Sequence, residues 1–229
     1  MEYYTRVLSK DEGIPPFDEL AQFICTQHPE YKLTIEEGTE EEWESLLLTG
    51  NDGFEVALIE RHPVTEGSLG EDEIADFVED LRDCRPESGV QWLEEYFTSV
   101  RTIYVFQHLQ GSDTTDGGNA LHALRSALWE RGDAIIQADG EGFTNEEGYH
   151  IVWQFSESVS GPWNMAVLQD GTWHQFIMDL GDSDHRNAFL QGEVPADLSD
   201  MGIYLTPPDT TGCGLTRVAN GAGPTCTAC

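Results

Sequence analysis

The 229-residue sequence predicts an α+β fold with a mainly antiparallel mixed sheet, about four flanking helices, a C-terminal strand meander and a disordered tail. Three observations support this prediction. Segments with strand character and segments with helical periodicity do not alternate regularly. The last part of the body is a run of strand-like segments joined by tight turns. The final 29 residues differ from the rest of the chain in charge and in aromatic content.

The strand predictions rest on short runs of β-branched and aromatic residues bounded by turn residues. YYTRVL at residues 3–8 and TIYVFQ at residues 102–107 are typical examples, and Asp170-Gly171 predicts a hairpin turn. Residues 46–48 fit a helix or a strand. The expected strands cover residues 3–8, 31–36, 54–59, 102–107, 134–138, 149–155, 163–168 and 173–179.

The helix predictions rest on apolar residues at helical spacing after a start signal. Prolines precede the first helix, in which Phe17, Leu20 and Ile24 share one face. Two further helices begin at the pairs Ser68/Glu71 and Ser88/Gln91, each with the spacing of a capping box. The glycine-rich stretch 111–119 is expected to be a loop, Asp116 or Asn119 caps the helix that follows, and one more helical turn is expected before Pro195.

The charge of the chain is unusual and unevenly placed. It has 43 acidic and 11 basic residues, a formal net charge of −32, and all of this excess lies within residues 1–200. Such a body repels phosphate backbones and anionic membranes, so nucleic-acid and membrane partners are not expected. No run of 18 apolar residues and no apolar leader is visible, so a cytoplasmic protein is expected, with Cys25 and Cys84 reduced.

The domain organisation follows the same contrast. Residues 1–200 are expected to form the acidic α+β domain, with an internal boundary near 111–119 if there are two lobes. Residues 201–229 are expected to form a flexible tail rich in threonine, glycine and cysteine. Cys213, Cys226 and Cys229 in this tail fit a zinc site, a redox motif, a segment modified by an enzyme, or a disordered appendage, and composition favours the last.

No catalytic motif appears in the sequence. It lacks the serine elbow, the phosphate-binding loop and the zinc-protease pattern, which favours a non-enzymatic role. Carboxylates and histidines near residues 139–150 and 174–185 have the chemistry of a divalent metal site, although their spacing misses the calcium-loop pattern. Alternation places His150 on the solvent side of its strand. The candidate metal ligands are Asp139, Glu141, His150, His174, Asp182 and His185.

Three tryptophans recur every ten residues along the C-terminal strands. Packing of strand neighbours explains this spacing, and an exposed aromatic surface for a partner is the alternative. Two glutamates in the 139–148 turn complete this candidate surface. The candidate partner-binding residues are Trp153, Trp163, Trp173, Glu146 and Glu147.

The leading hypothesis is therefore a soluble acidic binding protein, similar in character to immunity or inhibitor proteins, that neutralises a basic protein partner without a cofactor. The first alternative is a metal-binding protein or metal-dependent hydrolase. The second is a precursor in which residues 1–200 serve as leader and the tail is chemically modified.

Overall fold

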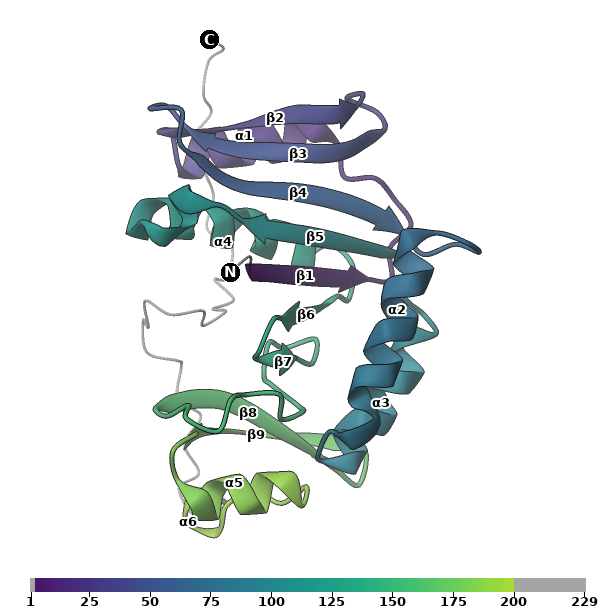
Figure 1. Ribbon diagram of the computed structural model, residues 1–229, viewed down its shortest axis with the longest axis vertical. Coiled ribbons are helices and arrows are strands. Elements are labelled where there is room, and N and C mark those ends of the chain that lie inside the picture. The colour runs from purple at the N-terminus through teal and green to yellow at the C-terminus, as the bar shows by residue number, and fades with distance from the viewer. Residues whose placement is uncertain (1–2, 200–229) are drawn as a thin grey trace.

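The computed structural model describes residues 3–199 and confirms the α+β fold. A seven-stranded sheet has the order β2-β3-β4-β5-β1-β6-β7, and each pair of neighbouring strands in it is antiparallel. A second, two-stranded sheet of β8 and β9 follows toward the C-terminal end (Figure 1). The predicted tail, with Cys213, Cys226 and Cys229, lies outside the described residues.

The elements extend the predicted segments by a few residues at most positions. Residues 46–48, where the sequence left helix or strand open, lie within the strand Trp43–Gly50. The strands are β1 Tyr3–Ser9, β2 Tyr31–Gly38, β3 Trp43–Gly50, β4 Glu55–Pro63, β5 Thr102–His108, β6 Ile135–Ala138, β7 Gly142–Phe143, β8 Pro162–Gln169 and β9 Thr172–Asp179. The helices are α1 Phe17–Gln27, α2 Leu69–Asp80, α3 Glu87–Phe97, α4 Thr115–Trp129, α5 Ser183–Leu190 and α6 Ala196–Ser199, with short 3-10 turns η1 Leu81–Asp83 and η2 Gln110–Asp113.

Helices cover both faces of the large sheet. The first core lies between the sheet and the helices α1 and α4, and the second lies between the sheet and α2 and α3. Alternation along β1 shows this division, because Val7 belongs to the first core and its neighbour Leu8 to the second. In Figure 1, α2 and α3 descend along one end of the strands toward the second sheet.

Two of the predicted helix starts are wrong. Ser68 does cap α2, since its hydroxyl accepts from the Glu71 amide at 3.2 Å. The helix α3 begins one residue earlier than the predicted cap Ser88, after Pro86, with no side-chain cap. The helix α4 is capped by Thr114, whose hydroxyl accepts from the Gly117 amide at 3.1 Å.

The stretch 111–119 is therefore largely helical, not a loop as predicted. Threonine and aspartate clusters favour both turns and helix starts, and sequence alone did not separate the two. Elements before and after this stretch share the large sheet, because β6 pairs with β1.

The predicted strand over 149–155 is also wrong. This segment has only isolated bridges, from His150 to Thr144 and to Met165, the second of them parallel. Its amides bond to three separate places: His150 to the Asn164 carbonyl, Ile151 to that of Phe143 and Trp153 to that of Arg85. The strand meander expected at the C-terminus is thus one hairpin, β8–β9, beside an irregular segment.

A third core lies under this hairpin. It joins the inner face of β8 and β9 to Phe155 and to Phe189 of α5. The predicted Asp170-Gly171 turn is confirmed, with both residues at positive φ and Gln169 opposite Thr172. Within residues 3–199, no helix is both long enough and apolar enough to cross a bilayer.

Candidate functional site

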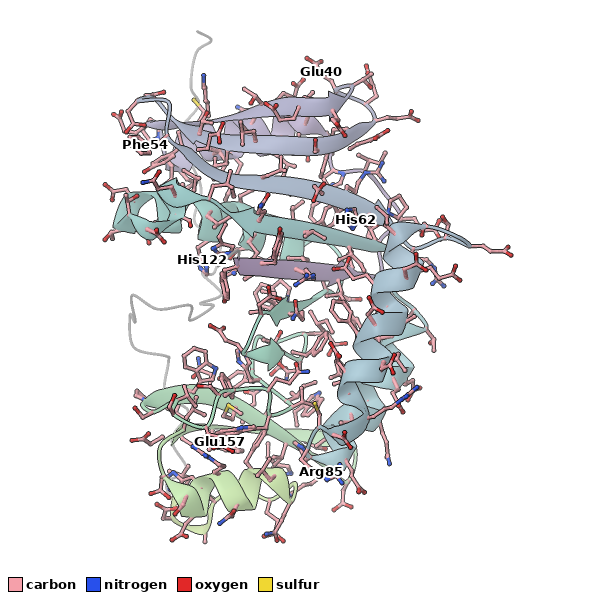
Figure 2. All side chains as sticks on the ribbon, viewed as in Figure 1. Glu40, Phe54, His62, Arg85, His122 and Glu157 are labelled. Atoms are coloured by element: carbon pink, nitrogen blue, oxygen red, sulfur yellow. The ribbon has the colours of Figure 1, made fainter. Side chains whose placement is uncertain are left out.

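The most concentrated charge in the described structure lies at the β2–β3 hairpin. Residues 36–44 contain six exposed glutamates within nine positions. Glu40 points away from the body at the outer end of this hairpin (Figure 2). We call this surface the acidic hairpin; its members are Glu36, Glu37, Glu40, Glu41, Glu42 and Glu44.

Gly38 makes the turn of the acidic hairpin compact. It has φ of 95°, and a Cβ atom there would lie 2.3 Å from the Glu42 carbonyl oxygen. Only glycine accepts this conformation and this approach without strain. The Thr39 amide donates to the Glu42 carbonyl at 3.1 Å, and the Thr39 hydroxyl accepts from the Glu42 amide at 3.1 Å. The turn is therefore fixed by its own hydrogen bonds.

Trp43 ties the acidic hairpin to the body. Its side chain is fully buried in the first core, although its two neighbours in the sequence, Glu42 and Glu44, are exposed. The indole Nε1 donates to the Pro15 carbonyl at 2.8 Å, and the ring lies 5.9 Å from that of Tyr104. Arg61 donates to the Trp43 carbonyl at 3.0 Å. The glutamates are thus presented on an anchored support, which reduces the entropy lost when a partner binds.

Most lysines and arginines of residues 3–199 pair with carboxylates away from the acidic hairpin. Within residues 3–199, no lysine, arginine or histidine forms an ion pair with the six hairpin glutamates. Six cations pair with other carboxylates, so they reduce the negative potential at those places instead. They are Arg6, Lys10, Arg82, Arg85, Arg101 and Arg131.

Glu146 and Glu147, the predicted partner-binding acids, lie elsewhere. Both are exposed on the turn after β7, at the edge of the sheet opposite β2. Glu146 accepts from Lys10 at 3.4 Å, and the Lys10 ammonium lies 4.2 Å from the centre of the Tyr96 ring. The two glutamates therefore do not add to the acidic hairpin.

The three tryptophans do not form one surface. Trp153 and Trp163 pack against the third core, where Arg186 lies 4.7 Å from the centre of the Trp153 ring. Trp173 packs against the second core and lies edge-on to Trp92 at 5.4 Å. Their ten-residue spacing reflects packing in separate cores.

Asp139 and Glu141 contact different side chains of β1. Asp139 Oδ1 accepts from Arg6 Nη1 at 2.8 Å, and its Oδ2 accepts from the Tyr4 amide at 3.2 Å. Glu141 accepts from the Tyr3 hydroxyl at 3.2 Å. Because Tyr3 and Arg6 are three residues apart on β1, where successive side chains alternate between faces, these contacts lie toward opposite faces of the sheet.

Arg6 is the centre of a partly buried ionic cluster. Its Nε donates to Glu73 of α2 at 2.5 Å, and its Nη1 also donates to Gln137 at 2.7 Å. The second oxygen of Glu73 lies 3.4 Å from His62 Nδ1. Burial raises the pKa of Glu73, but hydrogen bonds from His62 and Arg6 and the charge of Arg6 outweigh it, so the pKa is lowered.

A second polar group lies between β1, β5 and α4. Thr5 contacts His108 at 3.1 Å, and the nearly buried Arg125 lies 3.4 Å from His122. Burial and the Arg125 charge lower the pKa of His108 and of His122 to about 4. Burial raises the pKa of Glu141. The two imidazoles are therefore neutral near pH 7 and provide no positive charge for an anion.

His150 faces inward, not toward solvent as predicted. It accepts a hydrogen bond from Trp163 Nε1 on its Nδ1 at 3.0 Å, so the neutral ring carries its proton on Nε2. Burial lowers the pKa of His150 to about 3. The alternation rule failed because residues 149–155 are not a strand.

The other candidate metal ligands also have separate places. His174 is exposed on β9. Asp182 caps α5 by accepting from the amides of Asp184 and His185, at 2.8 and 3.1 Å. His185 Nε2 lies 3.1 Å from both oxygens of Asp197. Across residues 3–199, no group of three or more histidine, cysteine, aspartate or glutamate side chains has the arrangement of a metal site.

Comparison of the chain with protein-family models, with curated proteins and with solved structures gave no match. The site must therefore be identified from its own geometry. None of the six carboxylates of the acidic hairpin was among the predicted site residues, and of the Arg6 cluster only Asp139 was, as a metal ligand. The density of glutamates around Gly38-Thr39 is a sequence signal that identifies the first. The second joins residues more than 130 positions apart and leaves no local signal.

Proposed function

We propose that this protein binds a basic protein partner through the acidic hairpin. The observation that carries the proposal is the set of six exposed glutamates, held on an anchored turn and left without a cation partner among the described residues. A surface of one sign attracts and orients an oppositely charged partner and rejects partners of its own sign.

The preference for a protein partner has a physical basis in the shape of this surface. The carboxylates are all exposed on and beside a hairpin turn, where they can contact lysine and arginine side chains, whereas small-molecule sites are concave and bury most of their ligand. The wider charge of −32 gives the same sign of potential around the site. The functional neutralisation of the partner is part of this proposal.

The test is a titration with fluorescent polylysine and with a panel of basic proteins. The full chain is compared with two variants that each lose four charges. One carries glutamine at Glu37, Glu40, Glu41 and Glu42. The matched control carries Asp76→Asn, Asp83→Asn, Glu94→Gln and Glu95→Gln, all exposed on α2, η1 and α3.

We expect the hairpin variant to bind about tenfold more weakly and the control to stay within about twofold of the wild type. The wild-type affinity should also fall as ionic strength rises from about 0.02 to about 0.5 M, because salt screens exposed charges. Equal losses in both variants would mean that only net charge matters, and the hairpin would not be the site.

A further inference from the structure

The acidic hairpin adjoins an open sheet edge. Among residues 3–199, β2 is the outermost strand on its side of the sheet and pairs with β3 alone. The pairing runs in regular register from Tyr31 opposite Gly50 to Ile35 opposite Leu46, and the register shifts on either side of Glu37. Figure 1 shows β2 at the margin of the sheet with α1 behind it. One side of an edge strand presents backbone N–H and C=O groups that a further strand can bond.

The first core is incompletely covered at this same margin. Its half-buried apolar members all come from the segment that includes α1 and β2, whereas the strands farther in contribute fully buried residues. Along β2 the side chains facing α1 alternate with outward ones, so Tyr31 and Ile35 are half-buried around the buried Leu33. The half-buried members are Ile14, Phe17, Ala21, Phe23, Tyr31 and Ile35.

We propose that the free edge of β2 accepts an extended segment of the basic partner as an added strand. This inference rests on the proposed function and specifies how the partner binds. Main-chain hydrogen bonds to β2 would supply affinity that does not depend on sequence, and alternate side chains would supply specificity. The apolar side chains of the added strand would extend the cover of the first core next to α1.

The glutamates decide which strand is accepted. Charged residues on an edge strand normally prevent two copies of a protein from pairing edge to edge. Two acidic hairpins brought together would oppose many like charges, whereas a strand carrying lysine or arginine meets complementary charge. The same side chains therefore exclude a second copy of this chain and admit a basic strand.

The placement of charges along β2 also defines the segment that fits. Lys32, Thr34 and Glu36 share the face away from α1, with the cation at the start of the strand and the acid near the turn. We expect apolar β-branched residues in alternate positions toward α1. The basic residues should lie over the half of β2 that leads into Glu36 and Glu37.

Two synthetic peptides separate strand addition from attraction by charge alone. Both have the same sequence of alternating lysine and valine, and one is N-methylated at every residue, which removes the amide donors from both edges without changing charge. Each is titrated into the full chain at low salt. Hydrogen exchange of the β2 amides is followed in parallel.

We expect the unmethylated peptide to bind about tenfold more tightly than the methylated one, because the methylated peptide cannot form at least two of the backbone hydrogen bonds. It should also protect amides within Lys32–Ile35 from exchange, because the Tyr31 amide already donates to the His28 carbonyl at 2.9 Å and the register of β2 is irregular after Ile35. If both peptides bind equally and with strong salt dependence, strand addition is overturned and the proposed function stands. If neither binds, both are overturned.

A second measurement tests the role of the glutamates as a barrier to self-pairing. Sedimentation of the variant with glutamine at Glu37, Glu40, Glu41 and Glu42 should show more self-association than the wild type at equal concentration. The control variant on α2, η1 and α3 should behave as the wild type. An unchanged sedimentation profile for the hairpin variant would overturn the barrier.

Discussion

The acidic hairpin and the Arg6 cluster contain the same kind of side chain in opposite settings. At the hairpin, six glutamates are exposed and lack cation partners among residues 3–199. At the cluster, Glu73 is mostly buried and both of its oxygens have partners, Arg6 and His62. Carboxylates of the first kind act on what approaches the protein. Those of the second kind hold α2 on the sheet. Changes at each site should therefore have different consequences for binding and for stability.

The largest expected effect is on the anchor of the hairpin. Trp43→Ala should lower the free energy of unfolding by about 3–5 kcal/mol, because it empties a fully buried site in the first core and removes the hydrogen bond to Pro15. Urea denaturation measures this loss. Trp43→Phe keeps most of the packing and should cost clearly less. A cost below about 1 kcal/mol for the alanine variant would show that the hairpin is not anchored through this residue.

The next effect concerns the Arg6 cluster. Arg6→Met should lower the free energy of unfolding by about 2–3 kcal/mol, since it leaves Glu73 and Asp139 partly buried without their cation. Glu40→Gln, which removes a carboxylate from the acidic hairpin, should change it by less than about 0.5 kcal/mol. Equal effects in chemical denaturation would remove the distinction between the two settings.

The pH dependence of the Arg6 cluster has a definite sign. The pKa of Glu73 is lowered in the folded state from its ordinary 4.5, so its contribution is complete above that value and is lost as pH falls through the folded pKa. The difference in unfolding free energy between wild type and Glu73→Gln should therefore shrink on acidification below about pH 4.5. A difference that stays constant from neutral to acidic pH would contradict this assignment.

The smallest expected effect concerns the histidines between the sheet and α4. The folded pKa of His122 is about 4, below its ordinary 6.5, so the unfolded chain binds a proton first as pH falls. The free energy of unfolding should therefore fall as pH is lowered from about 6.5 to about 4, and His122→Gln should reduce this fall. We expect a reduction on the order of 1 kcal/mol, a modest value because the ring keeps some contact with water. Thermal or urea unfolding at several pH values measures it. An identical decline in the variant would mean that His122 is protonated in the fold.

Predictions that rest on local signals succeeded, whereas the prediction for residues 149–155 failed because its outcome depended on contacts with distant segments. Strand and helix segments such as 3–9 and 69–80 are defined by alternation, helical spacing and the Ser68 cap, which are all local. The predicted strand at 149–155 is wrong although Ile151, Trp153 and Phe155 alternate as in a strand. Ile151 packs in the second core and the two aromatic residues pack at the third, while the backbone amides of the segment bond to carbonyls of several separate segments. A regular pattern can thus arise without a regular partner.

The candidate site divides in the same manner. The glutamates around Gly38 are adjacent in sequence, so a turn in that place suffices to gather them, and the sequence alone determines that the surface is acidic. The partners of Asp139 and Glu141 are Arg6 and Tyr3, which lie more than 130 residues away. Only the pairing of β6 with β1 brings these residues together.

Composition and local pattern determined the α+β class, most element positions and the sign of the protein's electrostatic field. The tertiary structure decided which carboxylates are neutralised by cations and which remain open to a partner. It also decided that Trp153, Trp163 and Trp173 pack into separate cores and that β2 lies at an open edge. The physical reason is that periodicity defines two faces for each element, whereas the contact made by each face depends on strand order and on residues far away along the chain.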